Sequence, residues 1–244
     1  MVELHPIEPL VVVHPDAATL ATSAAARMIA LLQDVQASVN VANVALTGGG
    51  TGIAVLEQVA ASPLRDLVDW SRVEIYWGDE RFVPADDPER NAKQAWDALL
   101  SHVPIDPARV HEMAASDGEF GDDVNAATAA YEVPEALDLV LIGVGGEGHV
   151  LSVFPDSPAV AVTEDGPRVI AVRDCPKPPP TRISLTLPYI QRAAQVWALV
   201  SGDAKAEALA RAAAGEPASA VPVAGAVGRD RTVWLLDTAA ASQL

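Results

Sequence analysis

Short runs of apolar residues alternate with longer helix-like segments, the first of which is rich in alanine. Apolar runs of four to six residues bounded by turn signals are typical of buried strands. Strands are predicted at residues 10–13, 41–46, 73–77, 139–144, 169–172, 183–185, 196–200 and 233–236. Helices are predicted at residues 16–36, 53–61, 89–100, 125–131 and 204–214. Asp16 stands near the N-cap of the first helix, and Gly215 and Pro217 close the last.

Alternating strands and helices indicate βαβ units, which predict an α/β fold. We expect an open, mostly parallel Rossmann-like sheet with helices on both faces. No internal repeat is present, and we expect residues 1–244 to form one domain. Residues 114–123 and 174–181 have the most loop-like composition. The second stretch contains Lys177 followed by three prolines, a stiff run that is more typical of the rim of a site than of a linker.

The predicted strand at 139–144 ends in a glycine-dense turn that is followed by Glu147 and His149. In open α/β sheets, ligands bind where strands end and loops begin. A carboxylate two residues before a histidine can orient the ring or raise its basicity. The segment therefore predicts a general base delivered to a bound small molecule. The alternative is an ordinary turn with a surface histidine.

The same segment also satisfies the dinucleotide-binding pattern G-x-G-x-x-G, through the glycines of residues 143–148. That pattern requires a long helix, whereas Pro155 and Pro158 cut any helix short. It also requires an acidic residue at the end of the next strand. Glu164 and Asp165 precede the next apolar run instead. We therefore expect no nicotinamide cofactor.

Residues 47–52 follow a predicted strand and precede a predicted helix. Backbone N–H groups and the helix dipole bind phosphate in this arrangement. No Gly-Lys-Ser/Thr follows, so the segment is not a nucleotide P-loop. A glycine-rich turn without a ligand is the alternative. The candidate phosphate ligands here are Thr47, Gly48, Gly49, Gly50 and Thr51.

A charged segment, Asp79, Glu80 and Arg81, leaves the predicted strand at 73–77. Arg81 can bind an anion in a bidentate manner or stabilise an oxyanion, and the two carboxylates can position it. A solvated charged loop is the alternative interpretation.

Two further cations, Arg182 and Lys205, stand at junctions between strands and loops. Either residue alone is more often an ordinary surface cation. Lys205 opens a predicted helix, where the helix dipole disfavours a positive charge. A bound anion would remove that conflict, so both cations are candidate phosphate ligands.

The charge balance bounds the possible partners. The 244 residues carry a formal net charge of −17, with a sequence pI near 4.5. Such a surface disfavours nucleic acid and anionic membranes, although local cations still permit an anionic substrate. The amino-terminal residues lack the basic region of a signal peptide, and no apolar stretch approaches the roughly 18 residues that span a bilayer. A single cysteine, Cys175, excludes an internal disulfide, and we expect a cytoplasmic protein.

No metal-binding motif is present in the sequence, and we expect no metal and no cofactor. Ser152 lacks the G-x-S-x-G context of a serine hydrolase. The remaining histidines are isolated and are interpreted as surface or core residues. They are His5, His14, His102 and His111.

Taken together, the segments resemble the 6-phosphogluconolactonase family, in the wider group that includes glucosamine-6-phosphate deaminase. The resemblance extends from about residue 9 to residue 237. Residues 77–84, followed by Asn91, resemble the family's Asp-Glu-Arg segment. Some residues depart from the family pattern. Glu147 stands where Asp is frequent, Val150-Leu151-Ser152 stands where a sequence similar to Thr-Ala-Ser is frequent, and Gly50 and Gly52 stand where Ser and Pro are usual. The other matching segments are 45–52, 143–155, 178–188 and 201–209.

The resemblance implies hydrolysis of 6-phospho-D-glucono-1,5-lactone to 6-phospho-D-gluconate, in the oxidative pentose phosphate pathway, without a metal. It implies that His149 is the general base, that Glu147 orients it, and that Arg81 or nearby backbone N–H groups stabilise the oxyanion. It implies a phosphate site made of Thr47 to Thr51, Arg182 and Lys205. Asp79, Glu80 and Asn91 complete the candidate substrate site.

Two rival functions remain. A sugar-phosphate isomerase or deaminase is expected to continue with Asn-Glu-Pro after the histidine segment, whereas this chain has Phe154-Pro155-Asp156. A sugar-phosphate-binding regulator without catalysis would need the phosphate site but no pair of His149 and Glu147. The expected partner is a small sugar-phosphate lactone, and the expected assembly is a monomer or a weak homo-oligomer.

Overall fold

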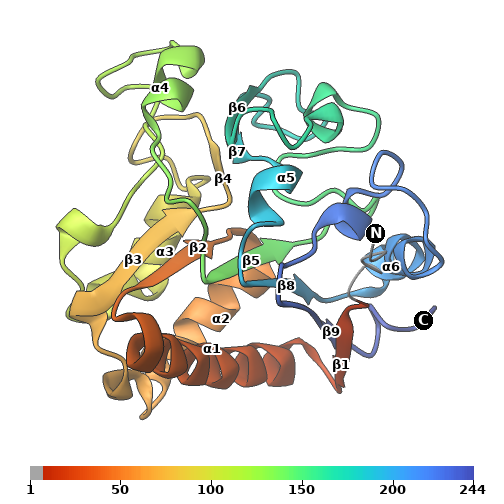
Figure 1. The fold of residues 1–244 in the computed structure, drawn as a ribbon, viewed down its shortest axis with the longest axis horizontal. Coiled ribbons are helices and arrows are strands. Elements are labelled where there is room, and N and C mark those ends of the chain that lie inside the picture. The colour runs from red at the N-terminus through yellow and green to blue at the C-terminus, as the bar shows by residue number, and fades with distance from the viewer. Residues whose placement is uncertain (1–7) are drawn as a thin grey trace.

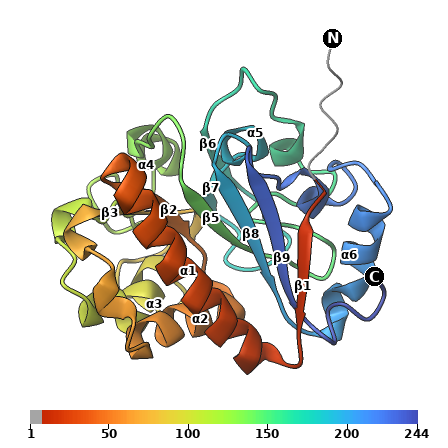
Figure 2. The same ribbon diagram turned by 60° about the horizontal axis from the view of Figure 1, so that its bottom comes forward.

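The computed structural model describes residues 8–244, and His5 lies outside the described residues. Six parallel strands form the main sheet, in the order β1-β9-β8-β5-β2-β3. Figure 2 shows β1, β9, β8 and β5 side by side in this order. This sheet confirms the predicted fold class. The strands are β1 (Leu10–His14), β2 (Ala42–Leu46), β3 (Val73–Trp77), β5 (Leu139–Gly143), β8 (Gln195–Val200) and β9 (Arg231–Asp237).

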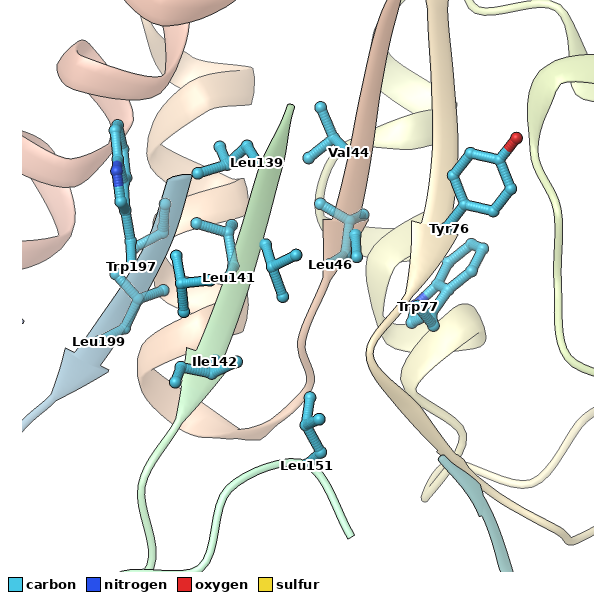
Figure 3. Close-up of a cluster of buried hydrophobic side chains, with 14 of the residues drawn as sticks. Val44, Leu46, Tyr76, Trp77, Leu139, Leu141, Ile142, Leu151, Trp197 and Leu199 are labelled. Atoms are coloured by element: carbon cyan, nitrogen blue, oxygen red, sulfur yellow. The ribbon is translucent and has the colours of Figure 1, made fainter. Parts of the chain in front are cut away.

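The central strands are apolar without alternation because helices and loops cover both faces of a parallel sheet. Leu139 to Ile142 of β5 are each no more than 1% exposed. Figure 3 shows β5 between β2 and β8, with Leu141 and Ile142 directed into a cluster that contains Leu46 and Leu199. Burial of this cluster is the main favourable contribution to folding.

Two long helices pack together on one side of the main sheet (Figure 1): α1 (Ala17–Val39) and α2 (Gly49–Ala61). The Asp16 side chain caps α1 by accepting the N–H of Thr19 at 2.8 Å, as the sequence predicted. On the opposite side of the sheet lies the short helix α5 (Leu187–Ile190). The remaining helices are α3 (Asn91–Ala98), α4 (Val124–Ala130) and α6 (Ala206–Ala213).

A second, antiparallel sheet joins three short strands in the order β4-β7-β6. They are β4 (Asp79–Arg81), β7 (Arg182–Leu185) and β6 (Val169–Val172). The sequence pattern predicted β6 and β7 but not their separate sheet, and it placed no strand at β4. The pairing sets Arg81 directly opposite Arg182, which joins two of the predicted site segments.

The order in which successive strands are added across the main sheet reverses between β2 and β5, although the two strands themselves are parallel. The connection from β2 leads to β3 on one side, whereas β5 pairs with β8 on the other side. The loops that leave the two carboxyl ends therefore diverge, which creates the crevice where open α/β sheets bind ligands. Thr47 follows β2 at this point, and the glycine turn that leads to His149 follows β5.

One boundary correction matters for the site, because α2 begins at Gly49 rather than at residue 53. The predicted glycine loop is thus largely the first turn of a helix. Other predicted boundaries lie within a few residues of the observed ones. Within residues 8–244, no helix is long and apolar enough to cross a membrane.

We expect Leu141→Ala to lower the free energy of unfolding by about 2–5 kcal/mol, because truncation of a buried leucine leaves a cavity. Leu67→Ala is the matched control, since the Leu67 side chain is 56% exposed and its truncation is expected to cost less than about 0.5 kcal/mol. Urea unfolding followed by tryptophan fluorescence measures both values. Equal losses in the two variants would contradict the assignment of β5 to the core.

Candidate active site

A cavity of about 190 Å³ opens where β2, β4 and β5 end and β7 begins. Larger cavities lie between α2 and α3, beside β6 and beside α6, but none of them is lined by a predicted site residue. The smaller cavity brings together eight of the residues predicted from sequence. Its wall is formed by Thr47, Gly48, Gly49, Asp79, Arg81, Asn91, Gly143, Val144, Gly145, His149, Leu151 and Arg182.

The His149 side chain is 15% exposed and stacks on the Phe154 ring, with the two centroids 4.3 Å apart. Its other face lies against Gly145, where an added Cβ would come within 1.9 Å of the imidazole Nδ1. Burial lowers the pKa of His149, the charge of Glu147 acts in the opposite direction, and the charge of Lys177 lowers the pKa further. The imidazole is therefore neutral near pH 7 and is able to accept a proton.

Glu147 lies between His149 and a lysine outside the cavity wall. Its Oε1 atom is 3.2 Å from Nδ1 of His149, although the two atoms are not aligned as a hydrogen bond. Its Oε2 atom accepts a hydrogen bond from Nζ of Lys177 at 2.9 Å. Burial acts to raise the pKa of Glu147, but the residue's own backbone N–H and Lys177 outweigh it, so the pKa is lowered and the side chain is ionised.

Arg81 is held in place by α3. Its guanidinium NH1 donates to the carbonyl of Glu89 at 2.5 Å and to Oδ1 of Asn91 at 2.6 Å. The amide of Asn91 donates in turn to the carbonyl of Asp79 at 2.8 Å. Asn91 also occupies the space beside Gly48, where an added Cβ would lie 1.8 Å from Oδ1. Asn91 therefore couples the orientation of Arg81 to the start of α2.

The amino terminus of α2 faces the cavity through Thr47, Gly48 and Gly49. Gly48 is the N-cap residue, and no side chain caps the helix there. The first N–H groups of a helix lack intrahelical partners and carry a partial positive charge, so this end suits an anion. Gly50 and Thr51 lie in the first turn of α2 but do not line the cavity.

Asp79 and Arg182 form a buried polar pair in the cavity wall. The Asp79 carboxylate accepts a hydrogen bond from the hydroxyl of Ser152 at 2.6 Å and lies 3.7 Å from NH1 of Arg182. The other guanidinium nitrogens of Arg182 donate to carbonyls of the proline-rich loop, Nε to Pro179 at 3.1 Å and NH2 to Lys177 at 3.0 Å. Arg182 thus orders this loop, and its NH1 is the nitrogen nearest to Asp79.

Glu80 contacts the start of α3, and its role toward the substrate stays a prediction. Its side chain is 1% exposed and lies outside the cavity wall. Its carboxylate accepts the backbone N–H groups of Arg81, Asn91 and Ala92 at 2.7–2.8 Å and lies 3.9 Å from NH2 of Arg90. Burial raises the pKa of Glu80 to about 6, although Arg90 opposes the shift. Glu80 therefore caps α3, and the segment is not a solvated charged loop.

Lys205 lies in the 3-10 turn Asp203–Lys205 and is the N-cap residue of α6, which begins at Ala206 rather than at residue 204. This turn packs on the histidine segment, because an added Cβ at Gly146 would lie 3.0 Å from the carbonyl of Ala204. Neither Lys205 nor Glu147 forms part of the cavity wall. Their roles stay predictions.

Sequence reasoning missed Ser152, Phe154 and Lys177 as parts of this site. Ser152 and Phe154 lie in the histidine segment, so their nearness to His149 could have been inferred from the sequence. Which side chains they contact could not be inferred. Lys177 stood in a predicted rim loop with no local feature to connect it to Glu147.

Among the described residues, the three other histidines hydrogen-bond to a backbone carbonyl or to a carboxylate, outside the cavity wall. His14 lies 3.1 Å from the carbonyl of Leu236, His102 lies 3.0 Å from that of Asp97, and His111 lies 2.7 Å from the Glu74 carboxylate. In the part of the chain that the structure describes, no group of three or more His, Cys, Asp or Glu side chains is arranged to hold a metal ion.

The fold and the cavity define an α/β protein with a histidine-containing cavity at the switch point of its sheet. The chain matches the family described as glucosamine-6-phosphate isomerases/6-phosphogluconolactonase over residues 15–234. It is 53% identical to a protein of Streptomyces coelicolor named 6-phosphogluconolactonase, over 97% of this chain and 95% of that protein. A Mycobacterium tuberculosis protein of the same name is 49% identical, over 95% and 97% of the two chains. The chain therefore belongs to the glucosamine-6-phosphate isomerase/6-phosphogluconolactonase family.

Solved structures share this fold at lower sequence identity. A 6-phosphogluconolactonase from Trypanosoma brucei superposes with a TM-score of 0.85 at 23% identity, over 98% of this chain and 99% of the other. A monomeric glucosamine-6-phosphate deaminase superposes with a TM-score of 0.78 at 19% identity, over 96% and 100% of the two chains. The fold is thus common to both activities, and the site must distinguish them.

We expect Glu80→Ala to lower the free energy of unfolding by about 3 kcal/mol, because it leaves two N–H groups of α3 without their acceptor and removes a buried carboxylate that lies 3.9 Å from the Arg90 guanidinium. Glu89→Ala removes an exposed carboxylate from the same region and serves as the control, with an expected loss below about 0.5 kcal/mol. Chemical denaturation measures both. Parent-like stability in Glu80→Ala would show that the carboxylate is not the cap of α3.

Proposed function

We propose that this protein hydrolyses 6-phospho-D-glucono-1,5-lactone to 6-phospho-D-gluconate in the oxidative pentose phosphate pathway, without a metal. The relatives that are 49–53% identical and carry the name 6-phosphogluconolactonase support this activity. The observation that carries the proposal is one cavity that combines a buried, neutral His149 with Arg81, Arg182 and the amino terminus of α2.

The substrate explains why so few groups suffice. A lactone is an activated ester, so hydrolysis needs no covalent nucleophile. His149 takes a proton from water while the water oxygen forms a bond to the ring carbonyl carbon. The resulting tetrahedral oxyanion is stabilised by Arg81 or by backbone N–H groups of the glycine turn. The imidazolium then protonates the ring oxygen as its bond to the carbonyl carbon breaks, which restores neutral His149 and releases the open-chain acid.

The phosphate supplies binding energy away from the reacting carbon. The amino terminus of α2, the NH1 group of Arg182 and the ammonium of Lys205 are the proposed ligands of this dianion. A dianion held there fixes the distance of the ring carbonyl from His149, which converts binding energy into orientation. These local positive groups also allow an anionic substrate to approach a chain whose net charge is −17.

A deaminase or isomerase is the second candidate, favoured only by the shared fold. Phe154, which stacks on His149, opens the Phe154-Pro155-Asp156 segment, where that activity was expected to carry Asn-Glu-Pro. Ammonia release from glucosamine 6-phosphate tests it. A binding-only regulator would be stabilised by sugar phosphates and show no turnover. The single domain, the cytoplasmic location and the state of a monomer or weak homo-oligomer stay predictions.

We expect His149→Ala to lower kcat by about 10² to 10⁴-fold, the usual contribution of a positioned general base. Acid release from freshly made 6-phosphogluconolactone in EDTA, with the spontaneous rate subtracted, measures the loss. His102→Ala is the control, because His102 lies outside the cavity wall and contacts only the Asp97 carbonyl. Turnover of His149→Ala within a few-fold of the parent would remove the proposed base.

We expect kcat to fall with decreasing pH along a limb whose midpoint lies below 6.5. The base must be neutral to act, and burial lowers the pKa of His149 from 6.5, so activity is retained until the pH falls below that lowered value. Glu147→Gln removes a charge that raises this pKa, so the limb should move to still lower pH. A midpoint above 6.5, or movement in the opposite direction, would contradict the role of His149.

A further inference from the structure

Lys177 connects a loop outside the cavity wall to the proposed general base. It lies between β6 and β7, and its Nζ atom donates to Oε2 of Glu147 at 2.9 Å. The other oxygen of that carboxylate lies 3.2 Å from Nδ1 of His149. One carboxylate thus bridges an ammonium and an imidazole. The hydrolysis described above does not assign a role to the lysine.

The imidazole needs an acceptor on its Nδ1 side. This nitrogen is buried, and no described residue is aligned with it as a hydrogen-bond partner. Oε1 of Glu147 is the carboxylate oxygen beside it, at 3.2 Å. A proton held on Nδ1 leaves the lone pair on Nε2, which is the form required of the base.

Glu147 needs an anchor to serve as that acceptor. Its side chain is 37% exposed and has three rotatable bonds, so a free carboxylate would spend much of its time in solvent. Lys177 supplies the anchor from the far side of the carboxylate. Gly145 leaves room for the arrangement, because an added Cβ there would lie 2.9 Å from Oε2 of Glu147.

Lys177 is itself fixed through its backbone. Its carbonyl accepts a hydrogen bond from NH2 of Arg182 at 3.0 Å, and Arg182 is 6% exposed. The carbonyl of Pro180 accepts the N–H of Cys175 at 3.0 Å, which closes the loop that carries the lysine. The three consecutive prolines further restrict the loop backbone. The Lys177 side chain therefore extends toward Glu147 from a loop whose backbone is ordered.

We propose that Lys177 is a positioning residue for the lactone hydrolysis proposed above: its ammonium fixes the Glu147 carboxylate beside Nδ1 of His149, so that the ring presents Nε2 as the base. The effect of Lys177 on catalysis rests on the proposed function. The geometric part, which concerns the tautomer of His149, stands independently of any substrate.

The charge of Lys177 also suits this position. The groups that act electrostatically on His149 are Glu147, Lys177 and Asp79. Both carboxylates raise the pKa of the imidazole, and the ammonium lowers it. A carboxylate that orients the ring thus need not leave it protonated near neutral pH, because the cation on its far side offsets part of the effect.

A double-mutant cycle tests whether Lys177 acts through Glu147. We expect Lys177→Met to lower kcat about three- to tenfold with an unchanged KM, and Lys177→Arg to recover part of the loss. In a Glu147→Gln background, Lys177→Met should lower kcat no further. Lys93→Met removes a charge of the same type from the surface pair of Lys93 with Asp97 and should retain parent activity.

Three results would overturn the proposal. An equal fold-loss from Lys177→Met in the parent and in the Glu147→Gln background would show that the lysine acts independently of the carboxylate. A raised KM with parent kcat would make Lys177 a substrate ligand. A comparable loss in Lys93→Met would reduce the effect to net charge.

A measurement without substrate separates this proposal from the proposed function. The ¹⁵N shifts of the His149 ring, assigned by comparison with His149→Ala, report the fraction protonated on Nδ1 at pH values above its pKa. We expect this fraction to be high in the parent and lower in both Lys177→Met and Glu147→Gln. An unchanged fraction in Lys177→Met would overturn the proposal even if the parent is active. If the fraction is lowered in the variants but the parent shows no lactone hydrolysis, the positioning role is retained and the lactonase activity is rejected.

Discussion

The pairing of β2 with β5 is the constraint on which the rest of the molecule depends. The two strands share a short parallel register, with Val44 opposite Leu139 and Ala45 opposite Val140. Because their onward connections lead to opposite sides of the sheet, this pairing alone brings the start of α2 and the His149 turn to one crevice. The apolar core beneath the crevice stabilises this pairing, so the geometry of the site depends on the packing of the sheet.

Most of the main sheet could be predicted from sequence because its signal is local. A buried parallel strand such as β5 is a continuous apolar run, and the Asp16 cap of α1 depends on neighbouring residues only. The strand β4 was missed for the opposite reason. Asp79, Glu80 and Arg81 have the composition of a solvated loop, and they form a strand only because β7, distant in sequence, supplies the pairing partner.

In the candidate site, too, features that depend on neighbouring residues could be predicted, whereas contacts between distant segments could not. Spacing within a segment placed His149 and Glu147 together and marked the turn before α2 as an anion site. The contacts of Glu80 could not be predicted, since no local pattern shows that its carboxylate turns toward the first N–H groups of α3. The partners Ser152 and Lys177 were missed because Asp79 and Glu147, which they contact, lie on other segments. Sequence thus predicted residues more readily than the contacts between them.

The register that sets Arg81 opposite Arg182 has a thermodynamic consequence for the folded chain. Like charges directly opposite each other on an antiparallel ribbon repel, and Asp79 compensates only in part, from 3.7 Å. An anion bound beside these two residues, as proposed above, offsets that repulsion, so binding of the proposed substrate and resistance to unfolding are linked.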